Sequence, residues 1–188
     1  MRRYFETIKC EDFKIFNLRY HKDRVASTIG LNLNLEDYIY PPNKKLLKCK
    51  LVYDQSGVLS VDFTAYKKQN IKSFKLIYDD MIEYDKKYEN RENIKKLFLQ
   101  KGDNDEIIIV KNNLISDTSK ANIAIKYKNG WITPKKPLLK GTKRAKMLEK
   151  KKITPSDITV DMLTNCQEFA LLNAMVGFYK IKGYEFER

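Results

Sequence analysis

The pattern of apolar and polar positions divides the chain into a β-rich first third and a mixed second part. Phe5–Lys9 and Lys14–Leu18 are rich in β-branched and aromatic residues, which predicts a pair of strands around the turn Glu11-Asp12-Phe13. From Tyr20 to Leu31 the apolar positions recur at helical spacing instead, which predicts a short helix. The residues expected near one face of that helix are Tyr20, Val25, Thr28 and Ile29.

A hairpin and a linker are expected next. Leu46–Tyr53 and Val58–Phe63 flank Asp54-Gln55-Ser56-Gly57, a turn in which the glycine can take positive φ. The polar stretch Tyr66–Lys72 is the best candidate for an interdomain linker. We therefore expect a small N-terminal lobe over residues 1–66, a linker over 67–73 and a C-terminal lobe over 74–188.

The second part mixes strands and helices without an internal repeat. Its expected strands are Phe74–Tyr78, Asp105–Val110, a segment around Ile115, Asn122–Tyr127 and, as the last one, Phe169–Met175. A turn at Asn129-Gly130 leads into Trp131–Pro134. Helices are expected over Arg91–Leu99, over the basic run Lys140–Lys152 with its start at Gly141, and over Thr159–Cys166. This order predicts an α+β (mixed α/β) fold with mixed sheets in two small lobes.

The composition of the chain indicates the cellular compartment in which the protein is expected. With 43% hydrophobic residues over 188 positions, the chain can bury a core. Cys10, Cys49 and Cys166 are scattered and lack metal-site spacing, which favours a reducing cytoplasm and argues against a zinc site. No apolar run approaches the roughly 20 residues of a membrane span, and the N-terminus lacks the apolar segment of a signal peptide. We expect a soluble cytoplasmic protein without a membrane or metal partner.

The net charge of +13 raises nucleic-acid binding as a hypothesis, because clustered lysine and arginine attract phosphates. The charge is mostly lysine, however, and it is spread over the whole length. The densest run, Lys140–Lys152, is typical of an amphipathic helix with a solvated basic face. Nucleic-acid binding is therefore kept as an alternative and not as the main prediction.

The residues with the clearest chemistry lie between Asp117 and Arg144. This stretch places an acid, a small polar turn, an asparagine, a Thr-Pro and a Gly-Thr-Lys-Arg helix start in one series. Lys87 lies thirty positions upstream of the acid. A lysine, a buried acid and a helix N-terminus are the parts that a protein needs to hold pyridoxal phosphate (PLP).

Several motifs together resemble those of the class IV aminotransferases, the family of branched-chain and D-amino-acid aminotransferases and of aminodeoxychorismate lyase. In chain order they are FETIK, YHKDR, KYENR, DEIIIV, ISDTSKANIAI, WITP, LLKGTKR and LLNAM. The motif Lys-x-x-Asn-Arg, present here as Lys87–Arg91, resembles the lyase branch. The resemblance implies the D-amino-acid aminotransferase-like fold of two lobes with PLP between them, in a homodimer that acts on a small molecule.

The resemblance also implies which residues hold the cofactor ring. Lys87 would form the Schiff base and shuttle protons, which requires an amine that burial or nearby positive charge keeps partly neutral. Asp117, in place of the family's usual glutamate, would pair with the pyridine nitrogen, and Asn122 belongs to the same turn. Phe5, Glu6 and Thr7 would lie on the substrate side.

The phosphate is expected at a second group of residues. Arg24 resembles the family's phosphate-binding arginine, and Gly141, Thr142 and Lys143 form the helix start whose backbone N–H groups would complete the site. Many relatives have Gly-Ile-Thr-Arg here, so the hydroxyl is displaced by one place. Asn173 and Ala174 match the loop that closes the phosphate and substrate side.

Ordinary structural roles compete with these assignments. Lys87 could be one more surface lysine, Asp117 could cap its turn through Thr118 and Ser119, and Arg24 could form a surface ion pair. His21, the only histidine, is expected to have a packing or capping role because the family transfers protons with the lysine.

Within the family the motifs favour the lyase that converts 4-amino-4-deoxychorismate to 4-aminobenzoate and pyruvate for folate synthesis. The alternative is an aminotransferase acting on a small or branched-chain amino acid. The chain starts almost at Phe-Glu-Thr, so we also expect an N-terminal lobe that is shortened relative to longer relatives, like the lyase half of fused synthase–lyase proteins. A third hypothesis is a basic nucleic-acid-binding protein without PLP.

Overall fold

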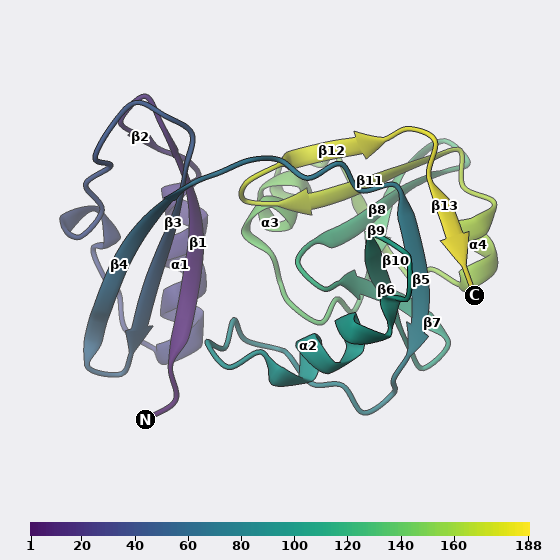
Figure 1. The fold of residues 1–188 in the computed structure, drawn as a ribbon, viewed down its shortest axis with the longest axis horizontal. Coiled ribbons are helices and arrows are strands. Elements are labelled where there is room, and N and C mark those ends of the chain that lie inside the picture. Colours follow the sequence, from purple (N-terminus) through teal and green to yellow (C-terminus); the bar gives the residue numbers. More distant parts are fainter. The chain divides into compact units, whose positions relative to one another are not determined.

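The computed structural model describes all 188 residues and divides into two compact units (Figure 1). The N-terminal unit comprises residues 1–68 and 86–90, and the C-terminal unit comprises 69–85 and 91–188. The sequence predicts that the chain passes between the two lobes once, at the linker 67–73. The units differ from that expectation because the chain returns to the N-terminal unit at 86–90, where Tyr88 pairs with Tyr4.

The N-terminal unit is an antiparallel sheet with one helix packed on it. The strand order is β2-β1-β3-β4, and the helix α1 supplies Val25 and Ile29 to a core shared with Ile8 and Leu51. The elements are β1 Tyr4–Glu11, β2 Lys14–Ile15, α1 Leu18–Ile29, the 3-10 helix η1 Leu35–Asp37, β3 Leu47–Asp54 and β4 Gly57–Ala65.

The hairpin prediction is confirmed by β3 and β4, and Gly57 has a φ of 123° at its turn. The predicted strand Lys14–Leu18 is wrong beyond Ile15. Asn17 takes a left-handed conformation with a φ of 57°, so the chain leaves the sheet and α1 begins at Leu18. The helix ends two residues earlier than predicted, at Ile29, because Gly30 closes it in the left-handed region.

The C-terminal unit is built on a mixed sheet. Its path is β10-β9-β8-β7-β6-β5-β13, and β11 adds to β8 and carries β12. The pairs β5–β6, β5–β13 and β9–β10 are parallel, whereas the other pairs are antiparallel. The strands are β5 Ser73–Tyr78, β6 Glu106–Lys111, β7 Leu114–Thr118, β8 Asn122–Tyr127, β9 Gly130–Pro134, β10 Thr154–Ser156, β11 Glu168–Asn173, β12 Gly177–Ile181 and β13 Glu185–Glu187. The helices are α2 Glu92–Phe98, the 3-10 helix η2 Leu99–Lys101, α3 Thr142–Glu149 and α4 Val160–Thr164.

Two predictions for this unit are wrong. Phe169–Met175 is not the last strand, because β12 and β13 follow β11. β12 is only partly buried along most of its length and β13 has three residues, so neither gives a clear apolar pattern. The helix predicted over Lys140–Lys152 is shorter, because the chain turns at Lys150 and Lys151 takes a φ of 52°.

The core of the C-terminal unit is centred on Phe169. This fully buried ring contacts Phe74 edge-on at 5.0 Å between centroids and Phe186 at 5.2 Å. Tyr184 packs on it at 5.4 Å. Phe169 thereby joins β11 to β5 and to the C-terminal strand β13.

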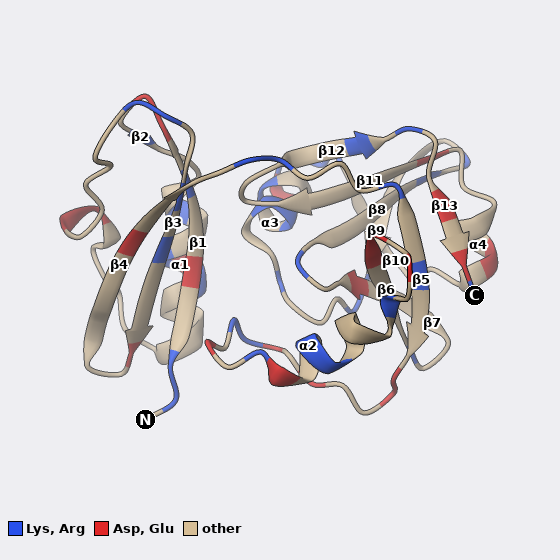
Figure 2. Ribbon diagram, in the orientation of Figure 1, with Lys and Arg blue, Asp and Glu red and all other residues tan.

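No helix of the structure is long and apolar enough to cross a membrane. Lysine and arginine occur on elements of both units (Figure 2).

Replacing Phe169 with alanine should lower the free energy of unfolding by about 3–5 kcal/mol, because the buried ring leaves a cavity among three aromatic neighbours. Leu99→Ala is the control, since Leu99 is 80% exposed, and it should change stability by no more than about 0.5 kcal/mol. Urea unfolding followed by circular dichroism measures both. Equal midpoints for the two variants would contradict the central role of Phe169.

Candidate functional site

The segment that carries Lys87 extends the N-terminal sheet beside β1. The Phe5 N–H donates to the carbonyl of Lys87 at 2.9 Å, and the Glu89 N–H donates to the carbonyl of Arg3 at 3.0 Å. Lys87 therefore stands opposite Phe5, and its Nζ lies 4.4 Å from the centroid of the Phe5 ring. The amine is held over an aromatic face and on a defined side of the sheet.

Phe5 and Thr7, the expected substrate-side residues, lie on the same face as Lys87, because alternate residues of a strand share a face. The register places Lys50 of β3 opposite Thr7. Its Nζ lies 5.8 Å from the centroid of the Phe5 ring and 3.0 Å from Oε1 of Glu89. This face of the N-terminal unit thus gathers an aromatic ring, a hydroxyl and two lysines.

Arg24 and His21 belong to α1, which packs on the other face of the sheet, and both contact one buried acid of β1. Nε of Arg24 donates to Oε1 of Glu6 at 2.8 Å, and its Nη2 donates to Oε2 at 2.5 Å. Nδ1 of His21 lies 2.5 Å from the same Oε2. Arg24 is therefore not in a surface pair, since Glu6 is fully buried and the Arg24 side chain is 11% exposed.

The charges of this cluster follow from its burial. Burial raises the pKa of Glu6, but the Arg24 guanidinium and the His21 ring outweigh it and bring the pKa to about 2. Burial lowers the pKa of His21 more than Glu6 raises it. At neutral pH the cluster therefore holds an ionised Glu6, a charged Arg24 and a neutral His21.

In the C-terminal unit, Asp117 and Asn122 face each other at the junction of β7 and β8. Nδ2 of Asn122 donates to Oδ1 of Asp117 and to the carbonyl of Leu139, both at 2.8 Å. The Leu139 N–H donates to Oδ2 of Asp117 at 2.9 Å. Asp117 thus connects to the segment before α3, and not to the amides of Thr118 and Ser119 that its expected turn role would use.

The start of α3 closely approaches the same asparagine. A Cβ added to Gly141 would stand 2.1 Å from Oδ1 of Asn122, so only glycine fits there. Gly141 is the N-cap of α3 and contributes no side-chain cap, which leaves the first backbone N–H groups of Thr142, Lys143 and Arg144 without an intrahelical acceptor. An uncapped helix N-terminus therefore lies next to the Asp117–Asn122 pair.

The expected loop residues also belong to this neighbourhood. Nδ2 of Asn173 donates to the carbonyl of Lys120 at 3.4 Å, and Ala174 follows it in the turn between β11 and β12. Gly177, at the end of that turn, lies near the Lys143 side chain, whose Nζ would be 3.9 Å from an added Cβ. The structure thus brings Asp117, Asn122, Gly141, Thr142, Lys143, Asn173 and Ala174 together within one unit.

Asp117 is a buried acid, and no ion pair with a lysine or arginine balances its negative charge. Burial raises the pKa of its carboxyl to about 6, against the opposing effect of the Leu139 N–H, the Asn122 amide and the Arg144 guanidinium. Arg144 itself is buried and donates through Nη2 to the carbonyl of Pro134 at 2.8 Å. A cation placed against Asp117 would favour its ionised form.

The sequence predicts no role for the Arg144 side chain, and the family resemblance places Glu6 only on the substrate side. The burial of Glu6 could have been predicted from its position in the strand, because Tyr4, Ile8 and Cys10, which lie on the same face, are apolar. For Arg144 no sequence signal separates a buried arginine from its exposed basic neighbours.

Comparison with known proteins covers most of the chain. The family described as amino-transferase class IV matches residues 88–184. A protein from Haemophilus influenzae is 32% identical over 184 residues, an alignment that covers 92% of this chain and 97% of the relative. A solved structure from Haemophilus somnus, provisionally named a 4-amino-4-deoxychorismate lyase, is 30% identical with a TM-score of 0.80, and covers 94% of this chain and 98% of that one.

Two further structures share the fold at 14% identity. One is provisionally named an amino-acid aminotransferase and comes from Mesorhizobium loti, with a TM-score of 0.78 over 97% of this chain and 99% of that one. The other is the PLP-bound form of a hypothetical aminotransferase from Mycobacterium tuberculosis, with a TM-score of 0.77 over 98% of this chain and 81% of that one. The fold and the matched residues together establish that this chain belongs to the class IV aminotransferase family, a PLP-dependent enzyme family.

Proposed function

We propose that this protein is a PLP-dependent lyase that converts 4-amino-4-deoxychorismate to pyruvate and 4-aminobenzoate, and that the 4-aminobenzoate is used in folate synthesis. Lys87 is the residue to which the cofactor is attached. When bound, the cofactor supplies an electron sink for the substrate carbon that bears the amino group. The observation that carries the proposal is the contact of Asp117, Asn122 and Gly141 beside the uncapped start of α3.

The phosphate end of the cofactor fits the start of α3. The free N–H groups at a helix N-terminus and the helix dipole both favour an anion. Lys143 adds positive charge, and its pKa is lowered by burial and by repulsion from Lys146 and Lys150, which an anion would relieve. The displaced hydroxyl of Thr142 is not needed for this role, because the backbone supplies the donors.

The ring nitrogen fits Asp117. Both carboxylate oxygens already accept one hydrogen bond, and each oxygen retains a second lone pair. The raised pKa of Asp117 means that its negative charge is poorly compensated within its own unit. A protonated pyridine nitrogen supplies the missing positive charge, and the ionised carboxylate in turn keeps that nitrogen protonated.

Lys87 carries out the proton transfers of the lyase reaction. The C–H bond at the amino-bearing carbon breaks, the bond from the ring to the enolpyruvyl oxygen breaks, and the ring becomes aromatic. Nζ of Lys87 accepts the first proton and returns one to the methylene carbon of the departing three-carbon unit. No oxidant or reductant is required, since the two products contain all the atoms of the substrate.

The residues on the face of the N-terminal sheet around Lys87 are suited to binding an anionic substrate. 4-Amino-4-deoxychorismate has two carboxylates, and the same face as Lys87 carries the hydroxyl of Thr7 and the ammonium of Lys50, which a substrate carboxylate would share with Glu89. Phe5 provides an apolar surface for a six-membered ring. The name of the Haemophilus somnus relative, at 30% identity, points to the same substrate. An aminotransferase is the second candidate, favoured by the family's description and by the names of the two structures at 14% identity.

Purified protein mixed with PLP should develop a visible absorption band, and borohydride should then fix a pyridoxyl group on Lys87, detected by peptide mass spectrometry. Lys87→Ala should show neither band nor label. Lys86→Ala is the matched control, because Nζ of Lys86 instead donates to the carbonyl of Thr28. Label on another lysine, or no uptake of PLP by the wild type, would refute the cofactor assignment.

Gly141→Ala should weaken PLP binding about tenfold or more, because its Cβ displaces the Asn122 amide from Asp117 and loses a hydrogen bond to a charged group. Absorption titration measures the affinity. Gly130→Ala should bind PLP like the wild type, since a Cβ there meets nothing within 4 Å. Equal affinities for the two variants would contradict the role given to the Asn122 contact.

The PLP-loaded protein should release 4-aminobenzoate and pyruvate in equal amounts from 4-amino-4-deoxychorismate without an added 2-oxo acid, and Lys87→Ala should release neither. Fluorescence of 4-aminobenzoate and a coupled assay for pyruvate measure the two products. Turnover restricted to an amino acid plus 2-oxoglutarate would exclude the lyase and support the aminotransferase.

A further inference from the structure

The turn that separates Asp117 from Asn122 has its backbone groups almost fully bonded. The Thr118 N–H donates to the carbonyl of Ala121 at 2.9 Å, which closes the turn. Oγ1 of Thr118 accepts the N–H groups of Lys120 and Ala121, at 3.3 Å and 3.0 Å. Because Asp117 and Asn122 flank this turn, any change in its shape alters the geometry of the pair.

Two charged side chains bind the backbone of Ser119 in the middle of the turn, one at its carbonyl and the other at its N–H. Nη2 of Arg91 donates to the carbonyl of Ser119 at 2.5 Å. Oε1 of Glu106 accepts the N–H of Ser119 at 3.3 Å. Hydrogen bonds to charged groups are stronger than neutral ones, and a cation on the carbonyl with an anion on the N–H fixes both flanking peptide planes.

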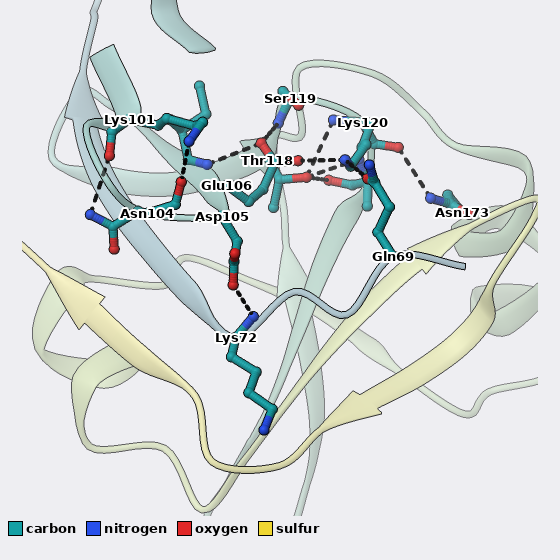
Figure 3. A network of polar contacts seen from close by, with 12 residues as sticks. Gln69, Lys72, Lys101, Asn104, Asp105, Glu106, Thr118, Ser119, Lys120 and Asn173 are labelled. Carbon is teal, nitrogen blue, oxygen red and sulfur yellow. Dashed lines mark hydrogen bonds and ion pairs between the residues drawn. The ribbon is translucent and has the colours of Figure 1, made fainter. Parts of the chain in front are cut away.

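The surroundings hold these two side chains in place. Glu106 is fully buried at the start of β6, and its Oε2 lies 3.4 Å from Nζ of Lys120. The guanidinium of Arg91 stacks 6.0 Å from the centroid of the Tyr84 ring. Figure 3 shows Glu106, Ser119 and Lys120 close together, with Asn173 reaching the carbonyl of Lys120 from the other side.

Arg91 also lies close to Lys87 in the sequence. Three residues separate the two, so their Cα atoms lie at most about 14 Å apart whatever path the chain takes. Arg91 is also the residue at which the chain re-enters the C-terminal unit after the Lys87 segment. The bond from Arg91 to Ser119 therefore holds, within the C-terminal unit, the residue that directly follows the Lys87 segment in the chain.

We propose that Arg91 is a positioning residue: with Glu106 it fixes the turn Thr118–Ala121, and thereby the Asp117–Asn122 pair, in the geometry that binds the cofactor. This inference rests on the proposed PLP-dependent function for its purpose. It gives the arginine of Lys-x-x-Asn-Arg a task distinct from that of the lysine, since Arg91 contacts the turn and its effect on the cofactor passes through Asp117.

Hydrogen–deuterium exchange of the cofactor-free protein tests the anchoring by itself. In Arg91→Gln, the amides of Ser119, Lys120 and Ala121 should exchange about tenfold faster or more than in the wild type, because a charge-assisted bond to the turn is lost. Glu106→Gln should act in the same direction. Arg91→Lys keeps the charge without the planar fork and should restore part of the protection.

Asn104→Ala is the matched control for loss of a buried polar side chain. Nδ2 of Asn104 donates to the carbonyl of Lys101 and to Glu187, not to the turn, so this variant should exchange at Ser119–Ala121 like the wild type. PLP titration is the second readout: Arg91→Gln should bind at least about tenfold more weakly, Arg91→Lys should lie between, and Asn104→Ala should match the wild type.

Hydrogen–deuterium exchange and PLP titration together show which part of the proposal is wrong if one of the expected results is not obtained. Wild-type exchange at the turn in Arg91→Gln refutes the anchoring. Faster exchange with unchanged PLP affinity refutes the positioning role. Failure of the wild type to take up PLP refutes the proposed function, and the exchange data still decide whether Arg91 holds the turn.

Discussion

The C-terminal unit places its candidate site around one close approach, that of the Gly141 backbone to the Asn122 amide. Because Gly141 lacks a Cβ, the amide can bridge the Asp117 carboxylate and the carbonyl of Leu139. That bridge connects β7, β8 and the segment leading into α3. Replacing any member changes the positions of the buried acid and the helix start together, so the proposed contacts to the ring nitrogen and to the phosphate depend on a single packing constraint.

The ion pair between Arg24 of α1 and Glu6 of β1 modifies the expectation that Arg24 binds the phosphate. The guanidinium is bound by Glu6 through two nitrogens, and the pKa of about 2 keeps that acid ionised at neutral pH. The pair is therefore neutral as a unit. A phosphate bound there would compete with Glu6 for the same donors, whereas the N–H groups at the start of α3 face no such competitor. In the proposed cofactor site, we therefore expect α3 and Lys143 to contribute more to phosphate binding than Arg24 does.

The fold was predictable where the local pattern and the tertiary structure agree. The hairpin of β3 and β4 and the buried runs of β6 and β8 follow from their alternating or continuous apolar residues. β12 and β13 were missed because their stability comes from pairing with β11 and β5 and from the contact of Phe186 with Phe169. Such contacts join residues distant in the chain, and no window along the sequence contains both partners.

The residues that support the site were harder to predict, because sequence displays charge and not burial. Of the 24 acidic residues, Glu6, Asp54, Glu106 and Asp117 are buried, and only Asp117 had been assigned a cofactor contact. Yet Glu6 lies on the face of β1 whose other residues are apolar, and Glu106 directly precedes four apolar residues. An acid at an apolar position must find a donor or cation, because burying an unpaired carboxylate is costly. Arg24 and Lys120 meet that requirement. The signals that could have found the two acids are the alternation of β1 for Glu6 and the continuous apolar run of β6 for Glu106.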